Sequence, residues 1–483
     1  MGVLTHNRAA GVLLGQAIGD ALGVPYEFGQ HPIQPGEARM IGGGLGHYRP
    51  GEWSDDTQMA LCVAQAAAGA DLTSPEGLGE VAKWFLRWLE SPPGDIGQLT
   101  ARVLRGAERE VAGLPYRPEP AAIAKIMLRQ SQEAAGGRSA GNGGLMRTAV
   151  VGLTALHDRD KVSDAARQVC ALTHADQSCQ ESCVLWSEAV RVAVAEQRLD
   201  VRAGLDLLPA QARGYWEEKI AQAEAGDPGR FDRNGWTVTA LQAAWSSIHA
   251  TRALGDHPDR FAQPRHLARA IGHDTDTVAA IVGGLLGGYF GVSRIPANLA
   301  RQVGGWPGGI RRSGLVQLAL EISGGGWDQA GSMLAPWSKP LGTKHPHDPG
   351  VILGTERDLL RADELGFDAA VSLSRLGQAD IAASGLDPAL IAEFWLIDSD
   401  DPSANADLAW TLQDAARTVK ALRDQGHRVL LHCVGAAHRT PSAALAYSHL
   451  LKAPADQAAR AIEEAVGHPV SGLLWQTARG LTS

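Results

Sequence analysis

The sequence has little of what several protein classes require. Its five cysteines are odd in number and irregularly spaced, so we expect reduced thiols in a cytoplasm rather than a disulfide framework. Aromatic residues make up only 5%, although 13 of them are tryptophan. There is no basic excess: the formal net charge of −9 argues against stable binding of nucleic acid or of an anionic membrane.

Long hydrophobic runs are also lacking. No signal peptide is evident at the N-terminus. The most apolar stretch, 278–292, has about 15 residues, short of the roughly 20 needed to span a bilayer. It directly follows an acidic run, so we expect a buried helix and no membrane partner.

What is present is an ordinary globular composition, with 45% hydrophobic and 20% charged residues among 483. That length predicts two or three domains. Up to about residue 325, apolar residues recur with helical spacing, which predicts a large all-α domain. The expected helices cover 9–22, 59–70, 80–90, 121–135, 161–172, 179–197, 237–254 and 277–290.

A change of pattern separates a second domain. Residues 326–350 are rich in proline and glycine and are expected to be a linker. Beyond it, short apolar runs of strand length alternate with helical patterns, notably at 407–423. We therefore expect a small α/β domain over 351–483 with a mostly parallel sheet, its strands at 351–353, 369–373, 394–397 and 429–431.

Two of the expected helices carry glycine at every fourth position. One series runs from Gly11 to Gly23 and the other from Gly283 to Gly291. Glycine weakens a helix by about 1 kcal/mol relative to alanine, so such a stripe needs a reason. We interpret both stripes as surfaces for close helix packing without direct chemistry.

Acidic clusters lie at or near helix ends in the first domain. Two of them are Ser54-Asp55-Asp56-Thr57 and Asp274-Thr275-Asp276-Thr277, and the third pairs Asp20 with Glu27. Each taken alone is typical of helix N-caps. A helix cap needs one oxygen-bearing side chain, whereas these clusters place three within four residues. Such a set suits a hard cation, and two such sets together suit a two-metal site.

These clusters belong to a series of motifs that resembles the ADP-ribosylglycohydrolases of the dinitrogenase-reductase-activating type. The resemblance extends over roughly residues 8–300. The matching segments, in the same order, are 15–23, Glu27-Phe28, 53–58, 141–147, 173–176 and 272–280.

The resemblance implies two Mg²⁺ or Mn²⁺ ions at the terminal ribose of ADP-ribose. Thr275 would point away from them, and Ser54 stands where many relatives have threonine. Glu27 would be the acidic residue beside the scissile bond. Ligand-binding positions would be Ser139, Gly141, Asn142, Gly143 and His174, and metal ligands would be Ser54, Asp55, Asp56, Asp274, Asp276 and Thr277.

The chemistry of the residues agrees with this assignment. Cleavage of a ribose C1″ bond develops oxocarbenium-like charge, and a carboxylate such as Glu27 can act as acid or base. The glycines of the loop at 141–144 would let backbone N–H groups approach a diphosphate. A competing zinc site of His174, Asp176, Cys179 and Cys183 lacks the usual paired-cysteine spacing, and buried cysteines are common.

A second constellation follows the expected strand at 429–431. Cys433 and Arg439 are separated by five residues and followed by Thr440, which resembles the C-x5-R-[ST] loop of cysteine-dependent phosphatases, especially the dual-specificity branch. Loop N–H groups and a helix N-terminus would bind phosphate and favour the thiolate form of the nucleophile. Arg439 would hold two phosphoryl oxygens, and Thr440 would assist release of the thiol.

By the same resemblance a general acid is expected about thirty residues upstream. Asp401 has the best spacing and Asp398 is the alternate; either is equally explained as part of a turn. One departure is Ala436, which stands where relatives usually carry glycine, with Gly435 one position earlier. His438 adds a possible cation beside Arg439.

The sequence thus predicts a cytoplasmic two-domain enzyme: a two-metal ADP-ribosylhydrolase followed by a cysteine-phosphatase-like module. Its substrates would be ADP-ribosylated protein, nucleic acid or small molecule, and a phosphorylated small molecule or protein for the second domain. Two alternatives stay open: a reader that binds ADP-ribose without hydrolysis, and a metal-dependent hydrolase of a free ADP-ribose-type metabolite.

Overall fold

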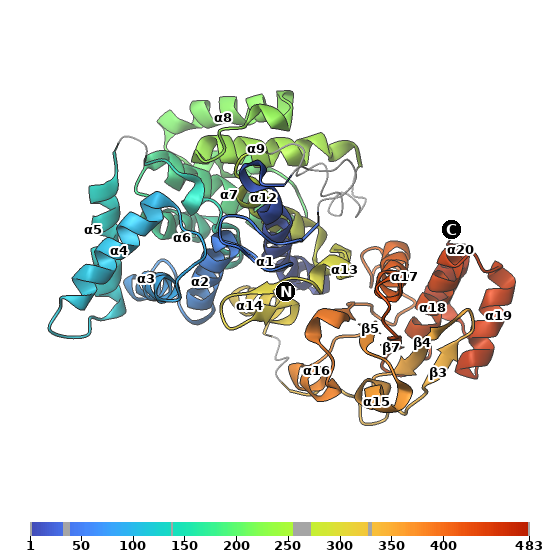
Figure 1. Cartoon of the computed structure of the whole chain (residues 1–483). Helices are drawn as coiled ribbons and strands as arrows, with labels where there is room; N and C mark the ends of the chain where they lie inside the picture. Colours follow the sequence, from blue (N-terminus) through green and yellow to red (C-terminus); the bar gives the residue numbers. More distant parts are fainter. Residues whose placement is uncertain (1, 32–38, 137–138, 255–271, 327–330, 482–483) are drawn as a thin grey trace. The chain divides into compact units, whose positions relative to one another are not determined.

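The computed structural model describes residues 2–31, 39–136, 139–254, 272–326 and 331–481. It divides into two compact units (Figure 1). Unit 1 comprises Met1–Val292 and Val303–Trp327; unit 2 comprises Ser293–Gln302 and Asp328–Ser483. None of the described helices has the length and apolarity needed to cross a membrane.

Unit 1 is mostly helical, which confirms the expected fold. All eight helices expected from periodicity are present, with ends that differ by a few residues. The α-helices are α1 (Val3–Gly23), α2 (Asp55–Gly69), α3 (Pro75–Glu90), α4 (Gln98–Ala112), α5 (Pro120–Ala134), α6 (Arg159–Ala171), α7 (Gln177–Glu196), α8 (Ala210–Ala225), α9 (Thr237–Ala250), α12 (Thr275–Phe290) and α14 (Arg312–Ile322).

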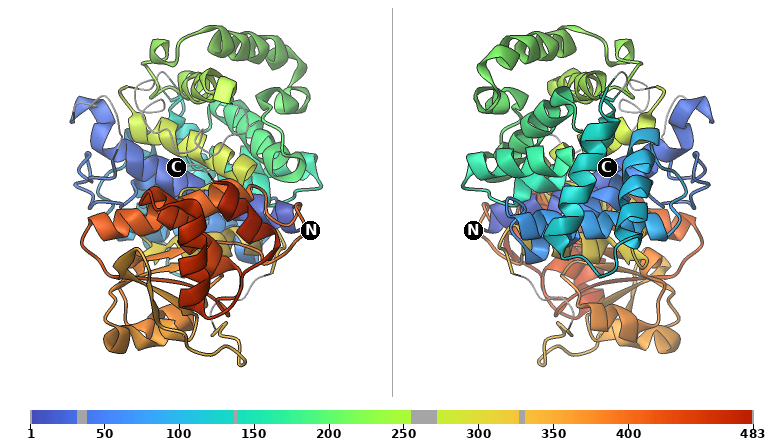
Figure 2. Two further views of the ribbon diagram at one scale, coloured as in Figure 1. Left: turned by 90° about the vertical axis from the view of Figure 1, so that its right-hand side faces the viewer. Right: turned by 90° about the vertical axis from the view of Figure 1, so that its left-hand side faces the viewer.

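Shorter elements connect these helices. The 3-10 turns are η1 (Val24–Gly29), η2 (Asn142–Gly144), η3 (Ala149–Leu153), η4 (Val201–Leu207), η5 (Pro228–Arg230) and η6 (Arg252–Leu254). Strand β1 (Gly304–Gly305) pairs antiparallel with β2 (Ile310–Arg311), and η7 (Val292–Arg294) begins at the last residue of the first segment of unit 1 and continues into unit 2. Helices α3, α4 and α5 pack side by side (Figure 2). Periodicity did not reveal α4, α8 or α14.

The glycine stripes form the centre of unit 1. Helices α1 and α12 pack against each other, and a methyl group at Gly15 would collide with the carbonyl oxygen of Gly283. Gly19 meets the backbone of Ala279 in the same way, and Gly23 meets that of Asp276. The packing interpretation is confirmed, and this seam brings the end of α1 to the start of α12.

Unit 2 is an α/β fold with a five-stranded sheet in the order β3-β4-β7-β5-β6. Only the β3–β4 pair is antiparallel. The strands are β3 (Thr343–His345), β4 (Asp348–Thr355), β5 (Ala369–Ser372), β6 (Ile391–Glu393) and β7 (Val429–Cys433). The other elements are α13 (Ala297–Ala300), η8 (Asp358–Arg361), α15 (Ala362–Leu365), α16 (Gln378–Ser384), η9 (Pro388–Leu390), α17 (Leu408–Asp424), α18 (Arg439–Leu450), α19 (Ala455–Val466) and α20 (Gly472–Gly480).

Apolar residues cover both faces of this sheet. Val351 and Leu353 of β4 belong to one core, and Ile352 between them belongs to the other. Sheets buried on both faces use continuous apolar runs, which is why the strands were visible in the sequence. Two expectations need correction: the strand expected at 394–397 lies at Ile391–Glu393, and β3 falls inside the stretch that we expected to be a linker.

Candidate functional sites

Three carboxyl groups meet at the junction of η1 and α12. Oxygen atoms of Glu27, Asp274 and Asp276 lie within 4.8 Å of one another. Within the described residues, this is the one such group of three or more His, Cys, Asp or Glu side chains. The packing of α1 against α12 brings these carboxyl groups together. Gly23 lies against the backbone of Asp276, and Glu27 follows Gly23 by only four residues.

The second acidic cluster occupies the first turn of α2. Ser54 is the N-cap: its Oγ accepts from the Asp56 N–H at 3.4 Å and donates to Asp56 Oδ2 at 3.0 Å. Asp20 holds this turn in place, since it accepts from the Ser54 N–H (2.9 Å), the Thr57 N–H (3.0 Å) and the Thr57 hydroxyl (2.6 Å). Asp20 is therefore a positioning residue, with both carboxylate oxygens engaged.

The carboxyl groups of the two clusters influence one another. Burial, followed by the charges of neighbouring carboxylates, raises the pKa values of Asp55, Asp56 and Asp276 well above normal. Burial and then the charge of Asp274 raise the pKa of Glu27 to about 7. Asp56 Oδ1 is buried without a hydrogen-bond partner. This crowded donor set consists of oxygen atoms alone, and it fits divalent ions such as Mg²⁺ or Mn²⁺.

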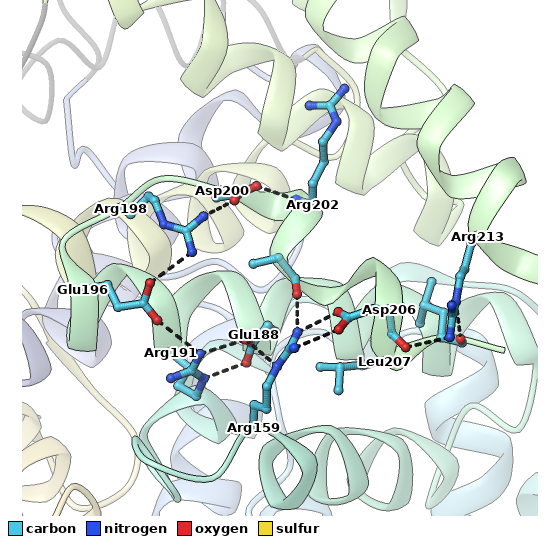
Figure 3. A network of polar contacts seen from close by, with 12 residues as sticks. Arg159, Glu188, Arg191, Glu196, Arg198, Asp200, Arg202, Asp206, Leu207 and Arg213 are labelled. Carbon is cyan, nitrogen blue, oxygen red and sulfur yellow. Dashed lines mark hydrogen bonds and ion pairs between the residues drawn. The ribbon is translucent and has the colours of Figure 1, made fainter. Parts of the chain in front are cut away.

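A different polar cluster in unit 1 shows how neutralised carboxylates behave. Around α6, α7 and η4, Arg159 binds Asp206 and Glu188, and Arg191 binds Glu188 and Glu196 (Figure 3). The hydrogen bond from Arg159 lowers the pKa of Asp206. These carboxylates have arginine partners and need no ion, whereas the largest electrostatic influences on Asp55 and Asp276 are other carboxylates.

The glycine-rich loop joins the acidic site. Asn142 Nδ2 donates to Asp274 Oδ2 at 2.8 Å and to the Asn234 carbonyl at 2.9 Å. Gly141 pairs with Trp236 as an isolated bridge. Ser139 is buried, and its Oγ accepts from the Gly136 N–H at 3.1 Å. The loop is thus fixed at the start of α12.

His174 lies beneath this loop. It is buried, its Nδ1 is hydrogen-bonded to Thr173 at 2.8 Å, and burial lowers its pKa to about 3. A Cβ at Gly143 would come within 2.9 Å of the imidazole, so this glycine permits close packing. Contact of His174 with a ligand stays a prediction.

The zinc alternative gains no support among the described residues. Asp176 caps α7 by accepting from the Ser178 N–H at 2.8 Å. The Cys179 thiol donates to the Gly141 carbonyl at 3.2 Å. Together with His174 and Cys183 they do not form a group of converging ligand atoms in the described part of the chain.

Sequence reasoning missed two residues near the acidic site. The charge of Asp95, from the loop between α3 and α4, raises the pKa values of Glu27, Asp55 and Asp274. Trp236, paired with Gly141, is 43% exposed. A lone aspartate and a lone tryptophan carry no motif, so only spatial proximity reveals them.

In unit 2, the loop between β7 and α18 assembles the cysteine constellation. Cys433 is buried at the end of β7, and Arg439 begins α18. Arg439 Nη1 donates to the carbonyls of Leu373 (3.3 Å) and Leu396 (3.2 Å), which follow β5 and β6. The loop thus lies at the carboxyl ends of the parallel strands, the usual ligand position in such sheets.

The two candidate acids differ in position. Asp398 Oδ1 lies 3.0 Å from His438 Nδ1, and its Oδ2 lies 3.7 Å from Arg439 Nε. Asp401 instead accepts from the N–H and hydroxyl of Ser403, and these bonds lower its pKa. The structure brings Asp398 to the loop, although the spacing favoured Asp401.

The loop positions that depart from the phosphatase signature differ in their local surroundings. Ala436 adopts φ +54°, a left-handed conformation that favours glycine. Gly435 lies against the Trp337 ring, which a Cβ would approach to 3.0 Å. Ser338 Oγ donates to the Val434 carbonyl at 2.7 Å. Thr440 is buried, and its hydroxyl donates to the Gly354 carbonyl at 3.3 Å.

Comparison with known proteins assigns the first region. Residues 1–330 match the model of the ADP-ribosylglycohydrolase family, and the chain belongs to that family. The ADP-ribosylarginine hydrolase Tri1 of Serratia proteamaculans is 25% identical over 301 residues, 60% of this chain and 73% of that protein. The ADP-ribosyl-[dinitrogen reductase] glycohydrolase of Rhodospirillum rubrum is 26% identical over 303 residues, 62% of this chain and 90% of that protein.

Solved structures add less. An ADP-ribosylglycohydrolase-related protein complex aligns with a TM-score of 0.47 and 25% identity, covering 67% of this chain and 99% of the other. Tk-PTP in its active form aligns with 29% of this chain and 94% of its own, with a TM-score of 0.24 and 17% identity.

Proposed function

We propose that unit 1 is a divalent-metal-dependent ADP-ribosylhydrolase that cleaves the bond between ribose C1″ and a modified target. The observation that carries this proposal is the cluster of Glu27, Asp274 and Asp276 in a chain of this family, with Glu27 and Asp276 buried and Asp274 half-buried. Two ions would be held by Ser54, Asp55, Asp56, Asp274, Asp276 and Thr277. When bound, they supply positive charge and Lewis acidity at the ribose.

Glu27 is proposed as the proton-transfer group. Its carboxyl group lies beside Asp274 and Asp276, and in the metal-free protein burial, followed by the charge of Asp274, raises its pKa. In the proposed role it gives a proton to the leaving atom and takes one from the attacking water. The Leu45 N–H, which lies 3.4 Å from Glu27 Oε2, fixes the orientation of the carboxyl group.

The remainder of ADP-ribose is assigned to the loop. Ser139, Gly141, Asn142 and Gly143 would bind the diphosphate and ribose, with His174 beneath them. Trp236, exposed and adjacent to Gly141, offers a face on which the adenine can stack. Asn142 connects this loop with the acidic cluster, because its side-chain amide also donates a hydrogen bond to Asp274.

The substrate is proposed to be an ADP-ribosylated protein. The names of the two bacterial relatives make ADP-ribosylarginine the first linkage to test. Turnover should be measured with Mg²⁺ or Mn²⁺ on ADP-ribosylated protein, nucleic acid and free metabolites. Binding of ADP-ribosylated protein without turnover would favour the reader; turnover of free ADP-ribose derivatives alone would favour the metabolite hydrolase.

We propose a cysteine-dependent phosphatase as the function of unit 2, favoured by the arrangement of Cys433, Arg439 and Asp398. The Cys433 thiolate would attack phosphorus while Arg439 binds the phosphoryl oxygens and Asp398 protonates the leaving oxygen. Water would then hydrolyse the thiophosphate and release inorganic phosphate. Cys433→Ser should abolish release of phosphate from small-molecule and protein phosphomonoesters.

The proposed location is the cytoplasm. All five cysteines are free and buried, which is consistent with a reducing compartment.

A further inference from the structure

Phe28 combines backbone strain with an exposed side chain. Its φ of +46° lies in the left-handed region, where a bulky residue is an outlier and glycine is at ease. Its side chain is 56% exposed, so packing does not explain why phenylalanine occupies the position. Strained residues of this kind collect at functional sites, which directs attention to what surrounds Phe28.

The strain is tied directly to the acidic site. The Phe28 N–H donates to the His273 carbonyl at 2.6 Å, and His273 itself has φ +55°. Glu27 immediately precedes Phe28, and Asp274 immediately follows His273. This hydrogen bond therefore holds the proposed proton-transfer residue against the start of α12.

A second exposed apolar residue is linked to Glu27. The Leu45 N–H lies 3.4 Å from Glu27 Oε2, and the Leu45 side chain is 45% exposed. Phe28 and Leu45 come from different segments, η1 and the turn after Gly44, yet each is linked to Glu27 through its backbone.

We propose that Phe28 and Leu45 form an apolar lip that contacts the polypeptide carrying the ADP-ribose, and so select protein substrates. This inference rests on the proposed function of unit 1. If Glu27 exchanges a proton with the leaving atom, the target begins beside Glu27, and the two residues linked to Glu27 through their backbone lie close to that point. A polypeptide fits better than a nucleic acid, because two exposed apolar side chains suit contact with apolar groups and the chain's formal net charge of −9 disfavours a polyanion.

Steady-state kinetics on two substrates, ADP-ribosylated protein and free ADP-ribosylarginine, test the lip. Phe28→Gly and Phe28→Ala should each raise KM for the protein about tenfold and leave KM for the free substrate unchanged. Leu45→Ala should act in the same direction. Tyr116→Ala, which removes an aromatic ring that is 65% exposed elsewhere in unit 1, is the matched control and should change neither value.

Thermal unfolding separates strain from contact. Phe28→Gly should raise the melting temperature by about 2 °C, because glycine accepts the left-handed backbone, whereas Phe28→Ala retains the strain and should not. Equal losses on both substrates would overturn the lip and leave Phe28 as a support for Glu27. An unchanged protein KM beside normal wild-type turnover would overturn the lip alone. Absence of wild-type turnover on both substrates would overturn the proposed function, and the lip with it.

Discussion

The two units build opposite charge environments at the same kind of structural position. In unit 1, the N-termini of α2 and α12 carry the chain's own acids, Asp55, Asp56 and Asp276. In unit 2, α18 begins with Arg439 and has no acidic residue in its first turn. A helix N-terminus favours negative charge.

The difference teaches what each site requires from outside. Unit 1 presents a cluster of carboxylates, which suits a cation. Unit 2 presents an arginine and a helix N-terminus, which suit an anion. The comparison predicts that ligands and substitutions in one unit leave the chemistry of the other unchanged.

The largest expected effect is a double dissociation of activities. Asp274→Ala should abolish release of ADP-ribose from the modified target and weaken binding of Mn²⁺, because it removes a proposed metal ligand. Phosphatase turnover should persist. Cys433→Ser should do the reverse. Metal titration calorimetry and the two assays provide the measurements. Asp206→Ala, which removes a carboxylate paired with Arg159, is the control and should affect neither.

Glu27→Gln should slow the release of ADP-ribose from the modified target by about 10²–10⁴-fold, which is the usual contribution of a general acid–base group. Binding of Mn²⁺ should remain nearly intact, because the proposed ligands are untouched. Single-turnover kinetics together with metal titration measure both. An unchanged rate would exclude Glu27 from the mechanism.

The glycine seam sets a stability limit on unit 1. Gly15→Ala should lower the free energy of unfolding by up to about 3 kcal/mol, because the added methyl group collides with the Gly283 carbonyl. Gly69, at the end of α2, has no atom near its missing Cβ, and Gly69→Ala should be neutral or slightly stabilising. Urea unfolding measures the free energy of unfolding of each variant. Equal values for Gly15→Ala and Gly69→Ala would contradict the close packing of α1 against α12 at Gly15.

Acidification should affect the units in opposite directions. In metal-free protein, burial raises the pKa of Asp20 to about 6 and that of Glu27 to about 7, so unit 1 gains protons in the folded state and becomes more stable from pH 7 to pH 5. His174, whose pKa burial lowers, opposes part of this gain.

In unit 2, burial lowers the pKa values of His345 and His432 to about 4. As the pH falls, these histidines take up protons in the unfolded state before they do so in the folded state. The free energy of unfolding is therefore highest above about pH 6.5 and is lower by roughly 1–2 kcal/mol per histidine at pH 5. Hydrogen exchange resolved by unit measures both trends. Saturating Mn²⁺ should remove the gain in unit 1; a parallel response of both units would contradict the comparison.

The smallest expected effect concerns the cysteine loop. Ala436→Gly should stabilise unit 2 by about 1 kcal/mol, because glycine adopts φ +54° without strain. Gly435→Ala should destabilise it by forcing the loop away from Trp337. Thermal unfolding of the two single variants measures both effects. An unchanged melting temperature for Gly435→Ala would show that the contact with Trp337 does not require glycine at position 435.

Much of the fold was predictable because its signals are local. Helical periodicity located α1, α2 and α12, and apolar runs located β4, β5 and β7. Helix α8 escaped notice, and β6 was placed a few residues late because Phe394, Trp395 and Leu396 are buried as core although they lie outside the strand.

The candidate sites were predictable as chemistry and not as geometry. The motifs named Glu27, Asp274 and Asn142, but the hydrogen bond between the last two joins residues 132 positions apart. Spacing favoured Asp401 over Asp398, but in the folded chain Asp401 bonds to Ser403, whereas Asp398 lies beside His438 of the cysteine loop.

By itself, the sequence determined the types of ligand atom, the helical and strand periodicities, and the glycines that allow α1 and α12 to touch. How these atoms are used depends on the folded chain. Both carboxylate oxygens of Asp20 accept hydrogen bonds at the first turn of α2, and Phe28, with φ +46°, donates its N–H to the His273 carbonyl. The physical reason is that periodicity and propensity act over a few residues. Hydrogen bonding, burial and charge interaction depend on neighbours that chain folding brings from far away.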